Sequence, residues 1–146
     1  MDAINERVIF GGKVLKRSLP VYHGPPPSGV VGPKRLLLSQ GELANVYDAD
    51  EGLRYAALIE MRVGTVRGNH VHRVKEEIVY VISGRLELVV QELPKGERVA
   101  IELVPGDLAL ISTGIAHAIK PLEEGLAIEF SKTRFDPLDA ERVVLI

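Results

Sequence analysis

The chain has 146 residues, of which 46% are hydrophobic and 26% charged, and its formal net charge is −2. These values are typical of a globular domain and exclude general disorder, a membrane-spanning class and a basic nucleic-acid-binding surface. The chain has no cysteine, which excludes disulfides, thiolate zinc sites and a cysteine nucleophile, so any metal must be held by His, Asp or Glu.

The N-terminal segment has no feature of a secretory signal. MDAINERVIFGGK mixes charged and apolar residues and contains no continuous apolar stretch followed by a small-residue cleavage site. Apolar runs elsewhere have the length of strands, far below the roughly 20 residues that cross a bilayer. The sequence therefore predicts a cytoplasmic protein whose partner is a small-molecule substrate or ligand, with neither nucleic acid nor membrane bound.

Residues 1–45 are predicted to form an extended N-terminal arm with edge strands. RVIFGGKVL has the composition of one edge strand and RLLLS that of another. Between them, VYHGPPPSGVVGPKR is dense in proline and glycine, which disfavour a helix interior and a central strand. Because an arm with few local hydrogen bonds needs a surface to lie on, we expect a homodimer in which strands or the arm cross between subunits.

Residues 46–130 are predicted to form a β-barrel. Short runs rich in Val, Ile, Leu and Tyr recur between turn residues, a pattern typical of a sandwich or barrel with mostly sequential antiparallel pairing. The runs are YAALIEMRVG, EEIVYVISG, RLELVVQE, RVAIELVPG, DLALIST, HAIK and LAIEF. Residues 131–146 add a polar, turn-rich segment and a tail strand that contains VVLI. Together these features predict one all-β domain over residues 1–146.

Two of the four histidines lie one residue apart in GTVRGNHVHRVKEEIVYVISG. On a strand, residues i and i+2 share a face, so His70 and His72 present two imidazoles side by side, which is half of a metal site. A turn over residues 73–76 would let Glu77 open the next strand and fold back beside the histidines as an antiparallel neighbour of their strand. Glu76 is the competing ligand, because its even offset from His72 suits an unbroken strand.

A further ligand is expected from elsewhere in the barrel. His117 follows an apolar strand and a glycine-containing turn in PGDLALISTGIAHAIK and begins the next strand, a position that directs a side chain into a barrel. His23 lies in the proline-rich arm, and we expect it to be exposed and outside the site.

The stretch around the paired histidines resembles the first sequence motif of the cupin family, which is glycine, five residues, His-x-His, three or four residues, Glu, six residues, glycine. Its fixed positions correspond here to Gly64, His70, His72, Glu77 and Gly84. Every fixed position of that motif is filled in this chain.

The family's second motif runs glycine, five residues, Pro-x-Gly, two residues, His, three residues, Asn. Gly106, Gly114 and His117 stand at this spacing. Ser112 replaces the proline and Pro121 replaces the asparagine, so the metal-ligand position is kept while two structural positions are changed.

The resemblance implies a double-stranded β-helix, the jelly-roll barrel of a small single-domain cupin. It also implies that His70, His72, Glu77 and His117 hold one divalent transition metal at the mouth of the barrel. Three imidazoles and a carboxylate suit Fe, Mn, Ni, Cu or Zn and leave coordination positions open for water or substrate.

The resemblance extends to small cupins of sugar-nucleotide metabolism, which makes a sugar or sugar-nucleotide isomerase or epimerase the leading hypothesis. A metal-dependent dioxygenase and a non-catalytic binding or sensing module are the alternatives. No catalytic residue is assigned from the sequence. Four polar residues upstream of the first motif are candidates to line the cavity as acid, base or substrate clamp: Tyr47, Tyr55, Glu60 and Arg62.

Overall fold

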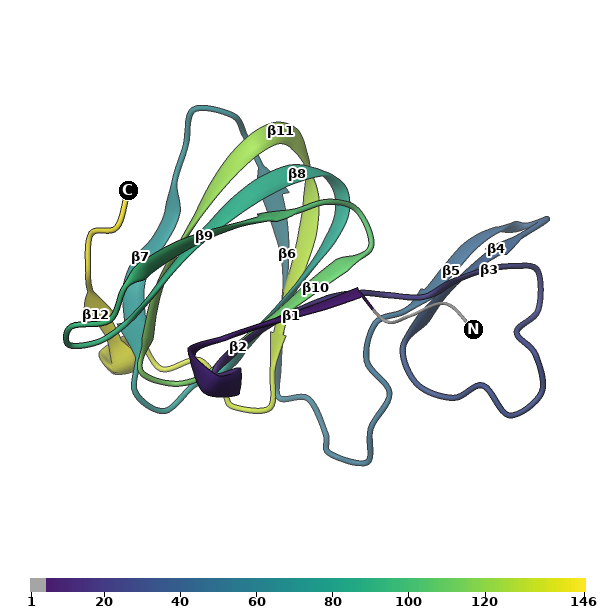
Figure 1. The fold of residues 1–146 in the computed structure, drawn as a ribbon, viewed down its shortest axis with the longest axis horizontal. Coiled ribbons are helices and arrows are strands. Elements are labelled where there is room, and N and C mark those ends of the chain that lie inside the picture. Colours follow the sequence, from purple (N-terminus) through teal and green to yellow (C-terminus); the bar gives the residue numbers. More distant parts are fainter. Residues whose placement is uncertain (1–4) are drawn as a thin grey trace.

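The computed structural model describes residues 5–146, which consist almost entirely of strands and turns (Figure 1). Within this range, no helix is long and apolar enough to cross a membrane. The elements in chain order are β1 (Asn5–Ile9), η1 (Phe10–Gly12), β2 (Val14–Ser18), β3 (Val21–His23), β4 (Lys34–Leu38), β5 (Gly41–Asn45), β6 (Tyr55–Met61), β7 (Arg67–His72), β8 (Glu77–Glu92), β9 (Arg98–Leu103), β10 (Asp107–Ile111), β11 (Ile115–Ser131), η2 (Pro137–Asp139) and β12 (Ala140–Arg142).

Nine strands of the described chain form one sheet that curls into a barrel (Figure 1). Its hydrogen-bonded order is β1-β2-β10-β8-β11-β7-β12, with β6 also paired to β11 and β9 also paired to β8. The two long strands, β8 and β11, pair antiparallel along most of their length. Of the shorter strands, β9 and β10 pair with β8, and β6 and β7 pair with β11. The predicted all-β, double-stranded β-helix is confirmed.

Alternation along the strands separates the inside of the barrel from its outside. On β8, Val79 and Val81 belong to the main core, whereas Ile78 and Tyr80 pack in a second apolar cluster on the opposite face. Successive side chains of a strand point to opposite faces, so this division follows directly from the sequence EIVYV. The main core is aliphatic, and its fully buried side chains include Met61, Leu86, Leu88, Ile101 and Leu103.

The two long strands differ from the sequence prediction. EEIVYVISG and RLELVVQE were expected to be separate strands but form the single strand β8. The turn residue between them, Gly84, has φ of 77°, and a Cβ at this position would lie 2.5 Å from the carbonyl oxygen of Glu124 on β11. A glycine is required at this close approach, and pairing with β11 carries β8 through the bend instead of ending it. HAIK and LAIEF are likewise merged into β11.

The N-terminal region combines barrel strands with a separate small sheet. RVIFGGKVL was expected to be one edge strand, but it folds as the hairpin β1–β2, and β2 continues the barrel sheet by pairing with β10. The proline-rich segment lies between β3 and β4, which pair in parallel, and β5 completes a three-stranded sheet. This sheet stands away from the barrel as an arm (Figure 1). Residues 1–4 of the predicted arm lie outside the described range, and the homodimer stays a prediction.

Truncation of a core side chain tests the assignment of the barrel interior. Leu88 is fully buried, whereas Leu43 on β5 is 52% exposed. Leu88→Ala should lower the free energy of unfolding by about 2–5 kcal/mol, because it removes apolar contacts and leaves a cavity. Leu43→Ala, the matched control, should change it by less than about 1 kcal/mol. Urea unfolding followed by circular dichroism measures both, and equal effects of the two substitutions would contradict the assignment.

Candidate metal centre

Four side chains from three strands meet inside the barrel, and they are the four that the sequence predicts. His70 and His72 come from β7, Glu77 from the first position of β8, and His117 from the start of β11. One potential ligand atom from each of the four lies within 4.8 Å of all the others. Except for His70, whose side chain is 29% exposed, these side chains are buried.

Strand alternation explains why the four side chains point inward. Glu77 lies two and four positions before the core residues Val79 and Val81 on β8, so its side chain points to the same face of the strand. His117 lies between Ile115 and Ile119 on the same face of β11, and both isoleucines belong to the core. The turn over residues 73–76 connects β7 to β8, as predicted, and brings Glu77 into the cavity of His72. The expectation that β7 and β8 are antiparallel neighbours is wrong, because β11 lies between them and pairs with both.

The nitrogen and oxygen atoms of the centre are close to one another. Nε2 of His72 is 2.9 Å from Oε1 of Glu77, and Nε2 of His117 is 2.8 Å from Oε2 of the same carboxylate. Nε2 of His70 lies 3.1 Å from Nε2 of His117 and 3.9 Å from Oε1 of Glu77. All three imidazoles therefore direct the same nitrogen toward one carboxylate.

The donor set fits a divalent transition metal. Nδ1 of His117 is 3.0 Å from the carbonyl oxygen of Ile115 and must donate to it, because a carbonyl only accepts. In the neutral imidazole, Nε2 then carries a lone pair directed at Glu77 and His70. Several lone pairs at such short separations are favourable only with a proton or a cation among them. His70, His72, Glu77 and His117 could thus hold an ion of the Fe, Mn, Ni, Cu or Zn type.

A glycine lets the strand of the paired histidines approach β11. Gly68 has φ of 84°, and a Cβ there would lie 2.8 Å from the carbonyl oxygen of His117. The register between β7 and β11 shifts at this point, from His117 opposite His70 to Ala118 opposite Gly68. A side chain at position 68 would push the two histidine-bearing strands apart.

A buried lysine accompanies the carboxylate. Nζ of Lys75 lies 3.1 Å from Oε1 of Glu77 and 2.9 Å from Oε1 of Glu129, and it is 4.5 Å from the centre of the Tyr55 ring. Burial alone would lower the pKa of Lys75, but the charges of Glu77 and Glu129 raise it above its ordinary value. Burial likewise opposes ionisation of Glu77, yet hydrogen bonds from His117 and His72, together with Lys75, hold its pKa far below the usual range. Glu77 is therefore ionised.

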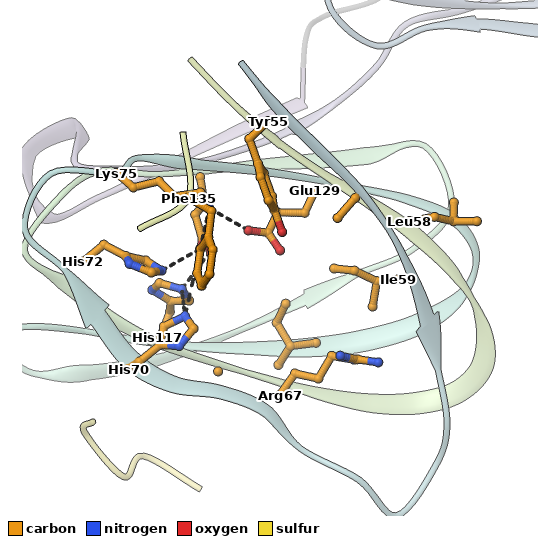
Figure 2. A pocket seen from close by; sticks show the side chains of 14 residues that line it. Tyr55, Leu58, Ile59, Arg67, His70, His72, Lys75, His117, Glu129 and Phe135 are labelled. Atoms are coloured by element: carbon orange, nitrogen blue, oxygen red, sulfur yellow. Dashed lines mark hydrogen bonds and ion pairs between the residues drawn. The ribbon is translucent and has the colours of Figure 1, made fainter. Parts of the chain in front are cut away.

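The centre forms one end of a cavity of about 240 Å³ (Figure 2). Tyr55, Arg67, Lys75 and Glu129 add polar groups to its wall, and Phe135 lies beside Tyr55, with 6.1 Å between the ring centroids. Burial raises the pKa of Glu129, the charge of Glu77 adds to this, and Lys75 opposes it. Burial also raises the pKa of Tyr55, so its phenol stays protonated at neutral pH. A small polar molecule in this cavity would lie next to both the histidines and these groups.

Several predicted polar residues do not contribute to the cavity. Glu60 pairs with Arg62 at 2.9 Å on the exposed face of the sheet. Tyr47 donates a hydrogen bond to the carbonyl oxygen of Glu51 and packs edge-on against Phe130 in the outer apolar cluster. Of the four upstream candidates, only Tyr55 lines the cavity, because it shares the inward parity of Ile59 and Met61, while Glu60 has the opposite parity.

Glu76, the competing ligand candidate, is not part of the group of converging ligand atoms. The carboxylate of Glu76 accepts hydrogen bonds from Ser131 Oγ at 2.9 Å, from the backbone nitrogen of Lys132 and from Thr133 Oγ1 at 2.9 Å. These contacts link the turn to the end of β11 and the segment that follows it. His23, on β3 of the arm, is exposed as expected.

Sequence reasoning missed Lys75, Glu129 and Phe135. Glu129 lies two residues after the core residue Ala127 in LAIEF, so it shares the inward face of the strand, and it lines the cavity. That spacing was the available signal. Lys75 lies in a turn and Phe135 in a loop, where no periodicity indicates direction.

The fold is a β-barrel built from one curled sheet, and a comparison of sequences places it in a family. A family model described as "Cupin domain" matches residues 57–129, which is half of the chain. The chain therefore belongs to the cupin family, as its motifs indicated. Curated proteins give no significant sequence match.

Solved structures with this fold include enzymes that act on sugars. The dTDP-4-dehydrorhamnose 3,5-epimerase of Sulfolobus tokodaii is similar over 97% of this chain and 82% of its own, with a TM-score of 0.74 and 18% identity. A 4-keto-6-deoxy sugar epimerase of Streptomyces spheroides is similar over 99% and 75%, with a TM-score of 0.74 and 19% identity. A 3,4-ketoisomerase of Helicobacter canadensis is similar over 75% and 86%, with a TM-score of 0.64 and 12% identity. At these identities, the likeness establishes the fold alone.

Metal content should depend on the paired histidines and not on the histidine of the arm. Protein purified without a histidine tag should contain a transition metal, and replacing both His70 and His72 with Ala should remove it, because two of four ligands are lost. His23→Ala is the matched control and should leave the metal content unchanged. Inductively coupled plasma mass spectrometry measures it. Metal content that is the same in the double variant and the parent would contradict the site.

The metal-free protein should lose stability on acidification through His70. Burial, together with the neighbouring His117, lowers the pKa of His70 from 6.5 to about 4. The unfolded chain therefore takes up this proton first, so the stabilising contribution is complete above pH 6.5 and is lost as pH falls toward about 4. His70→Gln should show a smaller loss of unfolding free energy over this interval in urea titrations. A His70 resonance that titrates near pH 6.5 in the folded protein would contradict this.

Proposed function

We propose that this protein is a divalent-metal-dependent cupin enzyme that isomerises or epimerises a small keto sugar or nucleotide-linked sugar. The proposal depends on one observation: the four candidate ligands His70, His72, Glu77 and His117 share a cavity with three other polar groups. These are the carboxyl group of Glu129, the phenol of Tyr55 and the ammonium group of Lys75. Metal ligands alone would suit many reactions. Proton-transferring groups beside them favour chemistry at a carbon next to a carbonyl.

An ion bound at the centre would supply Lewis-acid polarisation of a substrate carbonyl. The remaining chemistry belongs to side chains of this chain. Glu129 is a carboxyl group suited to remove a proton from the carbon beside the carbonyl, and the proton passes to Glu129 while the electron pair moves toward the carbonyl oxygen. Return of a proton to the other face of that carbon epimerises it. Return to the former carbonyl carbon isomerises the sugar, provided that the neighbouring carbon carries a hydroxyl whose proton passes to the former carbonyl oxygen, so that the carbonyl and the hydroxyl exchange places. Neither outcome consumes a co-reactant.

Tyr55 and Lys75 complete this assignment. The protonated phenol of Tyr55 is suited to donate a hydrogen bond or a proton to a substrate oxygen. Lys75 contacts both Glu129 and Glu77 and keeps their carboxylates in place. Its positive charge offsets part of their negative charge, which lowers the cost of burying two carboxylates in one cavity. Figure 2 shows Tyr55 and Glu129 on the wall next to the three histidines.

The structural comparisons support a sugar as the substrate. The Streptomyces spheroides protein acts on a 4-keto-6-deoxy sugar, and the Sulfolobus tokodaii protein on dTDP-4-dehydrorhamnose. Both contain a barrel of this fold, and both reactions move protons on carbons of a keto sugar. The polar lining of the cavity here is compatible with a hydroxylated ligand.

Solvent deuterium exchange tests the proposal directly. The protein, loaded with each candidate metal, is incubated in D₂O with free keto sugars and with TDP-4-keto-6-deoxyglucose, and mass spectrometry measures deuterium bound to carbon. We expect exchange with at least one substrate. Glu129→Gln and Tyr55→Phe should each slow it by about 100- to 10,000-fold, the range for loss of a general acid or base. Glu141→Gln, at an exposed glutamate, and Tyr22→Phe, on the arm, are the matched controls.

Two other outcomes would overturn the assignment. Oxygen consumption that accompanies turnover would indicate the dioxygenase alternative. A ligand that binds tightly but is recovered without deuterium or structural change would indicate a binding or sensing module.

A further inference from the structure

The strand that carries the paired histidines contains one extra residue. In the pairing of β7 with β11, His70 lies opposite His117 and Gly68 lies opposite Ala118, so Asn69 has no counterpart on β11. Such a β-bulge places two residues of one strand against one of its neighbour and redirects the side chains around it. Asn69 has φ of 55°, a left-handed conformation that asparagine adopts more readily than most residues. The bulge is therefore formed by Gly68 and Asn69, both with positive φ.

The bulge decides which side chains of β7 face the cavity. Arg67 and His70 both line it, although residues three positions apart on a regular strand point to opposite faces (Figure 2). Their partners on β11, Ile119 and His117, line the cavity as well. Without an extra residue at position 69, a strand paired through Arg67 would turn position 70 to the outside. His70 reaches the centre because of the bulge.

Asn69 is held from outside the barrel by residues 143–146. Its Oδ1 accepts hydrogen bonds from the backbone nitrogens of Leu145 at 2.8 Å and Ile146 at 3.3 Å, and its Nδ2 donates to the carbonyl oxygen of Ile146 at 3.4 Å. Its own carbonyl oxygen accepts from the backbone nitrogen of Val143 at 2.8 Å. A residue other than glycine keeps a positive φ where its surroundings hold it. The contacts to this short segment meet that condition.

Residues 143–146 are themselves fixed on the outer face of the barrel. Leu145 is 7% exposed and packs in an apolar cluster that includes Val71 of β7. Val71 lies between the two histidines of β7 and points to the face opposite theirs. The carbonyl oxygen of Leu145 also accepts a hydrogen bond from Nη1 of Arg98 on β9 at 3.2 Å. The segment is thus anchored by contacts that do not involve Asn69.

We propose that Asn69 is a positioning residue for the candidate metal centre: it couples residues 143–146 to the bulge of β7 and so keeps the His70 imidazole in the cavity. Asn69 does not line the cavity, so it acts through His70. The inference rests on the proposed function as far as the metal is concerned. It also makes a statement about the metal-free protein, in which the ring centroids of His70 and His117 lie 4.7 Å apart.

Two substitutions at this position separate the side-chain contacts from the backbone conformation. Glycine adopts a positive φ readily but offers no acceptor to the backbone nitrogens of Leu145 and Ile146. Aspartate also tolerates this conformation and keeps an acceptor for both. Asn69→Gly therefore removes the contacts, and Asn69→Asp retains them. Asn45→Gly is the matched control, since Asn45 lies on β5 of the arm and its side chain donates to Asp48.

Two readouts on the folded proteins test the proposal. In the metal-free protein, nuclear Overhauser contacts between the rings of His70 and His117 should be present in the parent, Asn69→Asp and Asn45→Gly, and lost in Asn69→Gly. In titrations with Co²⁺ alone, Asn69→Gly should bind about 10- to 100-fold more weakly than the parent, the range for loss of a group that orients a metal ligand. Asn69→Asp and Asn45→Gly should bind as the parent does. A purely structural role would lower the free energy of unfolding and leave both readouts unchanged.

The outcomes distinguish this inference from the proposed function. Asn69→Gly with the ring contacts and the Co²⁺ affinity of the parent would overturn the role of Asn69, and so would equal losses in Asn69→Gly and Asn69→Asp. In the parent alone, unprotected hydrogen exchange of the Leu145 amide would contradict it, and this measurement needs no variant to fold. A parent that binds no transition metal would overturn the proposed function, while the ring contacts would still decide whether Asn69 positions His70.

Discussion

The carboxylate of Glu77 is buried inside the barrel, where an ionised group is tolerated only if other groups compensate its lost hydration. His72, His117 and Lys75 each lie within 3.1 Å of one of its oxygens. These partners come from β7, from β11 and from the turn before β8. Satisfying this single charge therefore requires three parts of the chain to meet at one point, and the geometry of the candidate centre is a consequence of that requirement.

The barrel combines two kinds of interior that share the same strands. Inward positions along most of β8 and β11 are aliphatic and form the core, while inward positions near the start of β8 and near both ends of β11 carry Glu77, His117 and Glu129. The apolar part stabilises the fold through burial, and that rigidity holds the polar part in place. A site on paired strands is held more precisely than one on loops, which suits a centre whose ligand atoms must converge.

Around the centre, carboxylates link the chain's end to its middle in both directions. Glu76 in the turn accepts hydrogen bonds from the segment after β11, and Asp139 in that segment accepts them from the turn. The turn between the two ligand strands and the C-terminal segment therefore order each other. Lys75 and His72 lie between these contacts and the cavity, so the C-terminal segment influences the site without lining the metal centre itself.

The sequence by itself determined the class of fold and the four residues of the centre. Strand-length apolar runs and frequent turns predicted an all-β barrel. The i, i+2 spacing of His70 and His72, followed by a turn, predicted that Glu77 would join them, because alternation along a strand is a local property of the backbone. The position of His117 after a strand and a glycine-containing turn made it the candidate for a further ligand, and the family motif agreed with it and selected Glu77 over Glu76.

Only the tertiary structure decided the surroundings of the centre. Tyr55 and Glu129 point to the same side of their strands as nearby core residues. In β11, however, the register shifts between Pro121 and Ala127. Counting alternate residues from His117 therefore does not tell which side Glu129 faces. Lys75 and Asp139 lie in a turn and a short 3₁₀ helix, where direction depends on partners 54 and 64 positions away along the chain. Local sequence determines which face of a strand a residue takes, whereas contacts between distant segments are determined by how the whole barrel closes.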